Sequence, residues 1–307
     1  MFIEQGIHSE NRFWKYLLGS LLIIFASFVG QIPLLLAVIA KIFISGESYP
    51  ATNAEIMHFF EPNLTFFLIL ISFVFAFTAI WLVVKFLHKQ TLLSVTTSRK
   101  KVDWNRVFFS FGIWAVFSVV STFIFYLFNP TLYVLNFKPI PFAVLLLIAV
   151  ALVPVQTSTE EYIFRGYLMQ GFGNLAKNKW FPLVMTSLIF GGMHLFNPEV
   201  SKIGNIIFVY YIGTGLFLGV ITLMDEGMEL ALGFHAANNL IGALLVTSDW
   251  SAFQTDSIFK DLSEPQTGYD IILPVVVVYP VLLFIFSRKY RWYNWKEKLT
   301  GSINVNQ

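Results

Sequence analysis

The sequence predicts an all-α protein with about eight transmembrane helices, which form a single integral membrane domain over residues 1–307. Three observations lead to this class. Hydrophobic residues make up 56% of the chain and charged residues only 12%, whereas soluble proteins carry about 25% charged residues. The mean hydropathy is +0.69. Apolar runs of about 20 residues, the length that a bilayer-spanning helix needs, recur along the sequence. This composition excludes a soluble domain and a disordered chain.

The charge balance and the residue content also exclude several kinds of partner. The chain has 20 basic and 18 acidic residues, so no excess of positive charge favours a nucleic-acid partner. It has no cysteine, which excludes disulfides and thiolate metal sites. The partner that this composition predicts is the lipid bilayer itself.

Eight apolar segments are the expected membrane spans. The first bends near Gln31 and Pro33. The fourth contains Pro154 and then meets the polar run 157–161, so we expect it to kink or restart there. The expected spans are 16–44, 63–87, 107–128, 140–157, 181–197, 204–224, 229–247 and 270–287.

Basic residues sort to one side of these spans. Lysine and arginine gather in 89–106, at 177–179 and in the tail 288–298, whereas the connections 46–61 and 248–268 are mainly acidic. The positive-inside rule then places both termini in the cytoplasm. We expect an integral protein of a bacterial cell membrane. The aromatic and basic tail is typical of an interfacial anchor, with a lipid-headgroup or partner site as the alternative.

Polar residues at three of the apolar segments form the candidate site. Ionisable groups are costly inside a bilayer, so those present usually face a polar cavity or carry a function. They come from the end of the fourth span, from the fifth and from the seventh, all within a core region of about 140–250. The candidate residues are Glu160, Glu161, Arg165, His194, His235 and Asn239.

The acidic group also has purely structural interpretations. Thr157 and Glu160 have the spacing of a capping box, which would begin a helix there. Ser158 and Glu161 have the same spacing. Glu161 and Arg165 lie four residues apart and can form an intrahelical ion pair.

The histidines and glycines have structural interpretations as well. His194 can be an interfacial or packing residue, and His235 with Asn239, which share one helix face, can join two helices by hydrogen bonds. The glycines favour close helix packing rather than binding. They are Gly191, Gly192, Gly213, Gly215 and Gly219.

Hydrolysis of a peptide bond would give these groups a common purpose. It needs an activated water, a proton carrier and hydrogen bonds to an oxyanion. A carboxylate beside an imidazole can deprotonate water, while a second imidazole and an amide can bind the oxyanion. Alternatively, Glu160, His194 and His235 are a three-ligand set for zinc with one open position. The His-Glu-x-x-His pair of zinc proteases is absent from the sequence.

Three motifs resemble those of the CPBP intramembrane proteases, a family that includes CAAX prenyl endopeptidases and bacteriocin-processing and immunity proteins. Residues 160–165 resemble its Glu-Glu-x-x-x-Arg motif, 190–194 its Phe-x-x-x-His motif and 235–239 its His-x-x-x-Asn/Asp motif. The three occur in the family's order. The resemblance implies an α-helical fold of about eight spans with a polar cavity among the helices that carry the motifs.

The resemblance also implies roles for the residues. Glu160 is then the general base, with His194 holding the water, and His235 with Asn239 forms the oxyanion site. Glu161 and Arg165 support Glu160 by position. The implied substrate is a membrane-associated peptide or protein, such as a prenylated CAAX tail or a bacteriocin precursor. Whether a metal takes part stays open, with zinc the candidate, and we favour the glutamate scheme.

Two other functions compete with proteolysis. A non-catalytic membrane binding, immunity or scaffold protein could keep the motifs to hold a polar core together. A small-solute transporter could use the acid and histidine cluster as a proton relay. Transporters often have repeated halves, and the sequence has no internal repeat, so this function ranks last.

Overall fold

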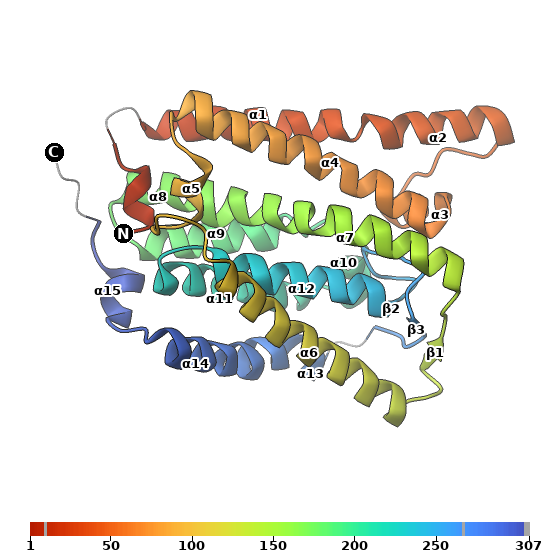
Figure 1. Cartoon of the computed structure of the whole chain (residues 1–307). Helices are drawn as coiled ribbons and strands as arrows, with labels where there is room; N and C mark the ends of the chain where they lie inside the picture. The colour runs from red at the N-terminus through yellow and green to blue at the C-terminus, as the bar shows by residue number, and fades with distance from the viewer. Residues whose placement is uncertain (9–10, 266–267, 304–307) are drawn as a thin grey trace.

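The computed structural model describes residues 1–8, 11–265 and 268–303. These residues form a bundle of long helices that run side by side, with one small sheet at an end of the bundle (Figure 1). The prediction of an all-α membrane protein is confirmed.

The first half of the chain contributes three long helical segments. The helices α1 and α2 are separated only at Gln31, close to the predicted bend. The elements are η1 (Ile3–Gly6), α1 (Phe13–Gly30), α2 (Ile32–Ser45), α3 (Asn53–Phe59), α4 (Pro62–Leu82), η2 (Val83–Leu87), α5 (Leu92–Thr96) and α6 (Trp104–Phe128).

The second half contains the three motif regions. Its elements are α7 (Pro139–Glu161), η3 (Tyr162–Leu168), α8 (Met169–Ala176), α9 (Trp180–Gly192), α10 (Pro198–Ile203), α11 (Ile207–Asp225), α12 (Glu229–Leu245), α13 (Tyr269–Leu273), η4 (Pro274–Val278), α14 (Tyr279–Tyr290) and α15 (Trp295–Thr300). The segments η2, η3 and η4 are π-helical turns inside longer helices.

Each of the eight predicted spans contains a helix. Within the described residues, six helical segments are long and apolar enough to cross a bilayer, which is roughly consistent with the prediction of about eight. The other two predicted spans correspond to α9, with 13 residues, and α12, with 17.

The expectation that the fourth span restarts near residue 157 is wrong. Helix α7 passes Pro154 and continues through η3 into α8, giving one helical segment of 38 residues. A proline is tolerated in a membrane helix where neighbouring groups hold the turn around it. Here Val153 is fully buried, and α7 packs against both α4 and α12.

A three-stranded sheet lies at the end of the bundle away from the N-terminus and α15 (Figure 1). Its strands are β1 (Tyr133–Leu135), β2 (Val246–Thr247) and β3 (Phe259–Asp261); β3 pairs antiparallel with β1 and parallel with β2. Strand β3 lies in a region that the sequence predicts only as a loop. Two or three residues per strand are too few for a periodic pattern.

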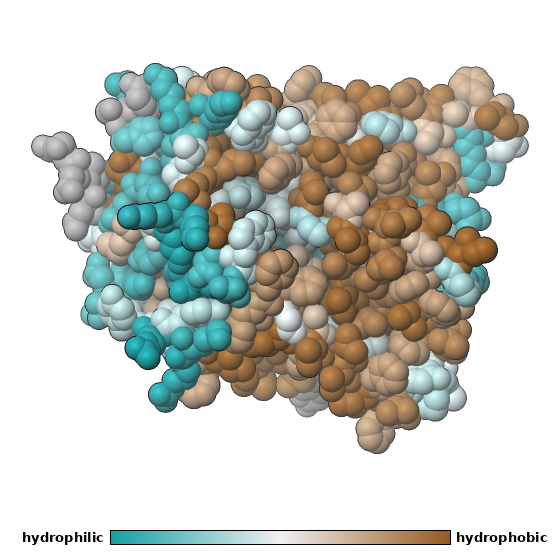
Figure 2. Space-filling view, in the orientation of Figure 1, coloured by the Kyte–Doolittle hydropathy of each residue, from teal (hydrophilic) through white to brown (hydrophobic). Residues whose placement is uncertain are grey.

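The surface separates into a polar end and an apolar belt (Figure 2). Hydrophilic residues gather at the end that holds the N-terminus, α5 and α15, which we call the polar end. Hydrophobic residues cover most of the remaining visible face, as expected for a surface in contact with lipid. The N-terminal segment and α15 therefore lie at the same end of the molecule (Figure 1).

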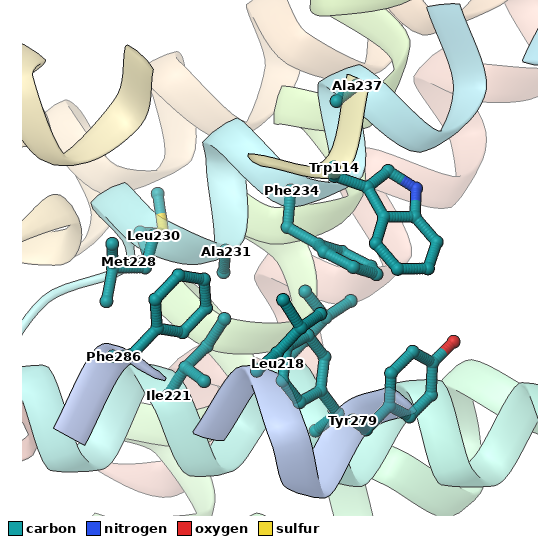
Figure 3. Close-up of a cluster of buried hydrophobic side chains, with 12 residues drawn as sticks. Trp114, Leu218, Ile221, Met228, Leu230, Ala231, Phe234, Ala237, Tyr279 and Phe286 are labelled. Atoms are coloured by element: carbon teal, nitrogen blue, oxygen red, sulfur yellow. The ribbon is translucent and has the colours of Figure 1, made fainter. Parts of the chain in front are cut away.

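The largest buried cluster of hydrophobic residues lies between α6, α11, α12 and α14 (Figure 3). Trp114, Phe234 and Tyr279 are among its members, and the Trp114 and Phe234 ring centroids are 4.4 Å apart. This cluster fixes α12, which carries His235 and Asn239, against its neighbours.

Candidate active site

The two adjacent glutamates end α7, and Arg165 follows them in η3. Arg165 and Glu161 are fully buried, and Arg165 Nη1 donates to Glu161 Oε1 at 2.8 Å. Arg165 Nη2 also donates to the carbonyl oxygen of Gly215 in α11, at 3.2 Å. The predicted ion pair is confirmed, and it ties α7 to a second helix. Burial without a partner would be prohibitive for either charge.

The capping-box interpretation of these glutamates is wrong. No helix begins at 157–161, because α7 runs through this stretch into η3. Thr157 Oγ1 instead donates back to the carbonyl oxygen of Val153 at 3.1 Å. The carboxylate oxygens of the glutamates therefore do not accept from backbone N–H groups at a helix start. They are available to other side chains.

His235 of α12 contacts both glutamates. Its Nδ1 lies 2.7 Å from Glu161 Oε1, and its Nε2 lies 3.4 Å from Glu160 Oε2. Glu161 Oε1 thus accepts from Arg165 and His235 together. An ionised carboxylate only accepts hydrogen bonds, so Nδ1 carries a proton. This leaves Nε2 to exchange a proton on the side facing Glu160.

Asn239, one turn after His235, reaches Glu160 through a residue that the sequence analysis missed. Asn239 Nδ2 donates to Gln156 Oε1 at 3.0 Å, and Gln156 Nε2 donates to Glu160 Oε1 at 2.7 Å. Gln156 precedes Glu160 by four residues and so shares its helix face. A polar residue at that spacing in an apolar helix was the signal that could have identified it.

His194 lies in a turn beyond the end of α9, whereas the sequence predicts it inside a membrane span over 181–197. Helix α9 ends at Gly192, consistent with the poor helix propensity of the Gly191–Gly192 pair. His194 Nδ1 donates to the carbonyl oxygen of Phe190 at 2.8 Å. Its ring stacks on Tyr211 of α11, with centroids 4.2 Å apart, another contact that the sequence analysis missed.

The Phe190 ring lies near the imidazole rings of both His194 and His235. Its centroid is 4.9 Å from that of His194 and 6.0 Å from that of His235, and Arg165 lies 4.4 Å above its face. The Glu160 carboxylate is also near enough to His194 for a direct electrostatic interaction. The three motifs therefore meet in one region of the bundle, as predicted.

The donors for the zinc alternative do not form a closed ligand set. A three-ligand centre needs all of its donor atoms about 2 Å from one point. Among residues 1–8, 11–265 and 268–303, no three histidine, aspartate or glutamate side chains lie close enough to hold a metal ion. Glu160 and His235 are adjacent, but the Phe190 ring lies beside both imidazoles. The residues in this arrangement do not fit that centre.

Comparison with known proteins identifies the motif region. Residues 138–241 match the family model described as type II CAAX prenyl endopeptidase Rce1-like, and all six candidate residues lie in this stretch. The chain is also 29% identical over 295 residues, 96% of each chain, to the uncharacterized protein YyaK of Bacillus subtilis (strain 168). No solved structure matches the chain. Residues 138–241 of this integral membrane protein are thus similar to the CAAX family of intramembrane proteases.

Proposed function

We propose that the protein is an endopeptidase that cleaves a membrane-associated peptide or protein with a water molecule activated by Glu160. The observation that carries this proposal is the position of the Glu160 carboxylate within the bundle. Gln156 donates to one of its oxygens at 2.7 Å, and the other lies 3.4 Å from His235 Nε2. A base held in this way can accept a proton in one fixed direction.

The charges of the buried cluster support a site that takes up one proton. With His235 neutral, the carboxylates of Glu160 and Glu161 outweigh the guanidinium of Arg165 by one negative charge. A proton on Glu160 or on His235 Nε2 brings the sum to zero. Because an uncompensated charge is costly in this environment, the arrangement suits a reaction in which an attacking water releases one proton to the cluster.

In the proposed reaction, the water oxygen attacks the peptide carbonyl carbon while Glu160 takes the water proton. His194 orients the water. Glu160 passes the water proton to His235 Nε2, and the resulting charged imidazole and the amide of Asn239 donate hydrogen bonds to the oxyanion. The C–N bond then breaks, and the proton held by the cluster passes to the leaving amine. The products are a free carboxyl group and a free amino group.

Two substrate classes suit a site inside a membrane protein. A prenylated CAAX tail is held at the membrane by its lipid, and a bacteriocin precursor or another membrane protein is the alternative in a bacterium. Both place an extended peptide next to the bilayer. The basic residues at the polar end further suggest that this end, with the N-terminus and α15, faces the cytoplasm.

The test is cleavage by the purified protein in liposomes, measured with fluorogenic peptides that carry or lack a prenylated carboxyl-terminal motif. We expect Glu160→Gln to lower the turnover by about 10²–10⁴-fold, the usual contribution of a general base. The matched control is Glu226→Gln, which changes a glutamate at the far end of α11 and should leave turnover unchanged.

Three outcomes would change this assignment. Normal cleavage by a folded Glu160→Gln variant would remove Glu160 from the mechanism. Loss of wild-type activity on exhaustive chelation, restored by zinc, would instead support the metal alternative. If wild-type protein cleaves no peptide and variants of Glu160, His194 and His235 keep a binding phenotype, the non-catalytic function is favoured.

A further inference from the structure

A chain of four hydrogen bonds leads from α6 to the Glu160 carboxylate. Trp114 Nε1 donates to Asn238 Oδ1 at 3.1 Å, and Asn238 Nδ2 donates to Asn239 Oδ1 at 3.0 Å. Asn239 Nδ2 then donates to Gln156 Oε1 at 3.0 Å, and Gln156 Nε2 donates to Glu160 Oε1 at 2.7 Å. The chain crosses from α6 to α12 to α7.

The chemistry of its two ends fixes the direction of this chain. An indole N–H can only donate, and an ionised carboxylate can only accept. The three amides between them must therefore all point the same way, each accepting at its oxygen and donating from its nitrogen. Hydrogen bonds aligned in this way polarise one another, so the last donor is stronger than an isolated amide.

We propose that Gln156, Asn238 and Trp114 are positioning residues that hold Glu160 in its ionised, proton-accepting form. This inference rests on the proposed function, because it concerns the base of that reaction. Hydrogen bonds donated to a carboxylate stabilise its charged form. The bond from Gln156 also fixes the Glu160 side chain, so that its other oxygen remains on the His235 side.

Trp114, the first donor of this chain of hydrogen bonds, is held rigidly. Trp114 is only 6% exposed and lies in the apolar cluster of Figure 3, against Phe234. Its ring also stacks on Phe117, with centroids 5.0 Å apart. A tryptophan packed in this way cannot turn its N–H elsewhere without disturbing the cluster, so the direction of the whole chain is anchored in the packing.

The same chain links the base to the oxyanion site. The Asn239 amide has two N–H groups, and the bond to Gln156 uses one of them. The second is available to a substrate oxygen. Trp114 and Asn238, which touch neither reacting group, orient this amide through Asn239 Oδ1.

The experiment measures kcat and KM as functions of pH for Gln156→Leu and Trp114→Phe in liposomes. For Gln156→Leu we expect the acidic limb of the kcat profile to move by about one unit to higher pH, because a hydrogen bond to a charged group is lost. Trp114→Phe, which keeps an aromatic ring and removes only the most distant donor, should move it less, in the same direction. We expect KM to change little in either variant.

Two control variants lose comparable hydrogen bonds outside the chain. Thr157→Val removes a hydroxyl that donates to backbone on the same helix, and Trp292→Phe removes an indole N–H that donates to Asp225. Neither should move the profile. An acidic limb that stays at the wild-type position in both folded test variants would overturn the inference.

The two proposals fail in distinguishable ways. If Glu160→Gln is inactive while the Gln156 and Trp114 variants keep the wild-type pH profile, only the inference about the chain is wrong. If Glu160→Gln cleaves normally, the proposed base itself is wrong. Thermal unfolding in detergent shows whether each variant is folded, and Trp114→Phe remains as a test if Gln156→Leu does not fold.

Discussion

A single oxygen, Glu161 Oε1, has two tasks in the candidate site. It accepts from Arg165 at 2.8 Å and from His235 Nδ1 at 2.7 Å. The first contact compensates a buried negative charge, and the second sets the orientation of the imidazole that faces Glu160. Structural and functional interpretations of the Glu-Glu-x-x-x-Arg motif therefore do not exclude each other, because the ion pair is what places the imidazole.

Removal of Arg165 should therefore destabilise the protein strongly. In Arg165→Leu, Glu161 stays buried without its cation, and we expect a loss of about 3–5 kcal/mol in the free energy of unfolding. The measurement is reversible unfolding in mixed micelles. Lys260→Ala is the control, since it breaks an ion pair with Asp249 whose side chains are 32% and 67% exposed, and such pairs contribute about 1 kcal/mol or less. Similar losses in the two variants would contradict this assignment.

The sequence predicted the ionisable residues of the site better than the amides that hold them. A buried Glu, Arg or His stands out in an apolar segment, because each is rare there. Gln156 and Asn238 are uncharged, and Trp114 is an apolar-looking residue in an aromatic-rich chain. Their role depends on three helices meeting at one point, which a pattern within one segment does not reveal.

At the scale of elements, the sequence predicted where the helices are but not how they continue. Each of the eight predicted spans contains a helix, yet α7 continues past Pro154 without the expected restart. The π-helical turn η3, which carries Arg165, was also not predicted. Such turns depend on which carbonyl the backbone N–H reaches, and that choice is set by packing and not by hydrophobic periodicity.

The prediction that glycines allow close packing is confirmed at most of the named positions. An added Cβ would come within 3 Å of a neighbouring segment at four of them, whereas Gly192 has nothing within 4 Å. The four are Gly191, Gly213, Gly215 and Gly219. Gly215 also gives its carbonyl oxygen to Arg165, so this close contact between α9 and α11 lies next to the buried ion pair.

A pair of glycines in α12 tests helix packing near the site. A Cβ at Gly233 would lie 2.0 Å from the carbonyl oxygen of Val107 in α6, whereas Gly242 has open space. We expect Gly233→Ala to cost about 1–3 kcal/mol of stability through overpacking and to lower cleavage, because α12 also carries His235. Gly242→Ala should be neutral or slightly stabilising, since alanine favours a helix. Equal melting temperatures for both variants would contradict this view of the α6–α12 contact.

At the scale of the whole molecule, the polar end is held together by side chains from distant parts of the sequence. His88, which follows the end of its span, is completely buried there. Its Nε2 lies 2.9 Å from the Tyr167 hydroxyl, and its Nδ1 contacts Asn11 Oδ1. Asn11 Nδ2 in turn donates to the Tyr16 hydroxyl at 2.8 Å. The network joins the N-terminal segment, α1 and η3 in one buried polar cluster.

This cluster makes stability depend on pH in a defined window. The pKa of His88 is lowered from 6.5 to about 4, mainly by burial and in smaller part by repulsion from Lys15 and His8. The unfolded chain therefore binds one proton more than the folded chain between these values, so stability rises with pH from about 4 to 6.5 and is complete above that range. The shift in the pKa corresponds to at most about 3 kcal/mol in the free energy of unfolding.

Thermal unfolding in detergent at pH 5 and pH 7.5 should show this difference in stability, and His88→Gln should reduce it. His58→Gln, which changes a histidine of α3 outside this cluster, should leave it intact. A pH dependence that is the same in His88→Gln and in wild-type protein would show that another group titrates in this window.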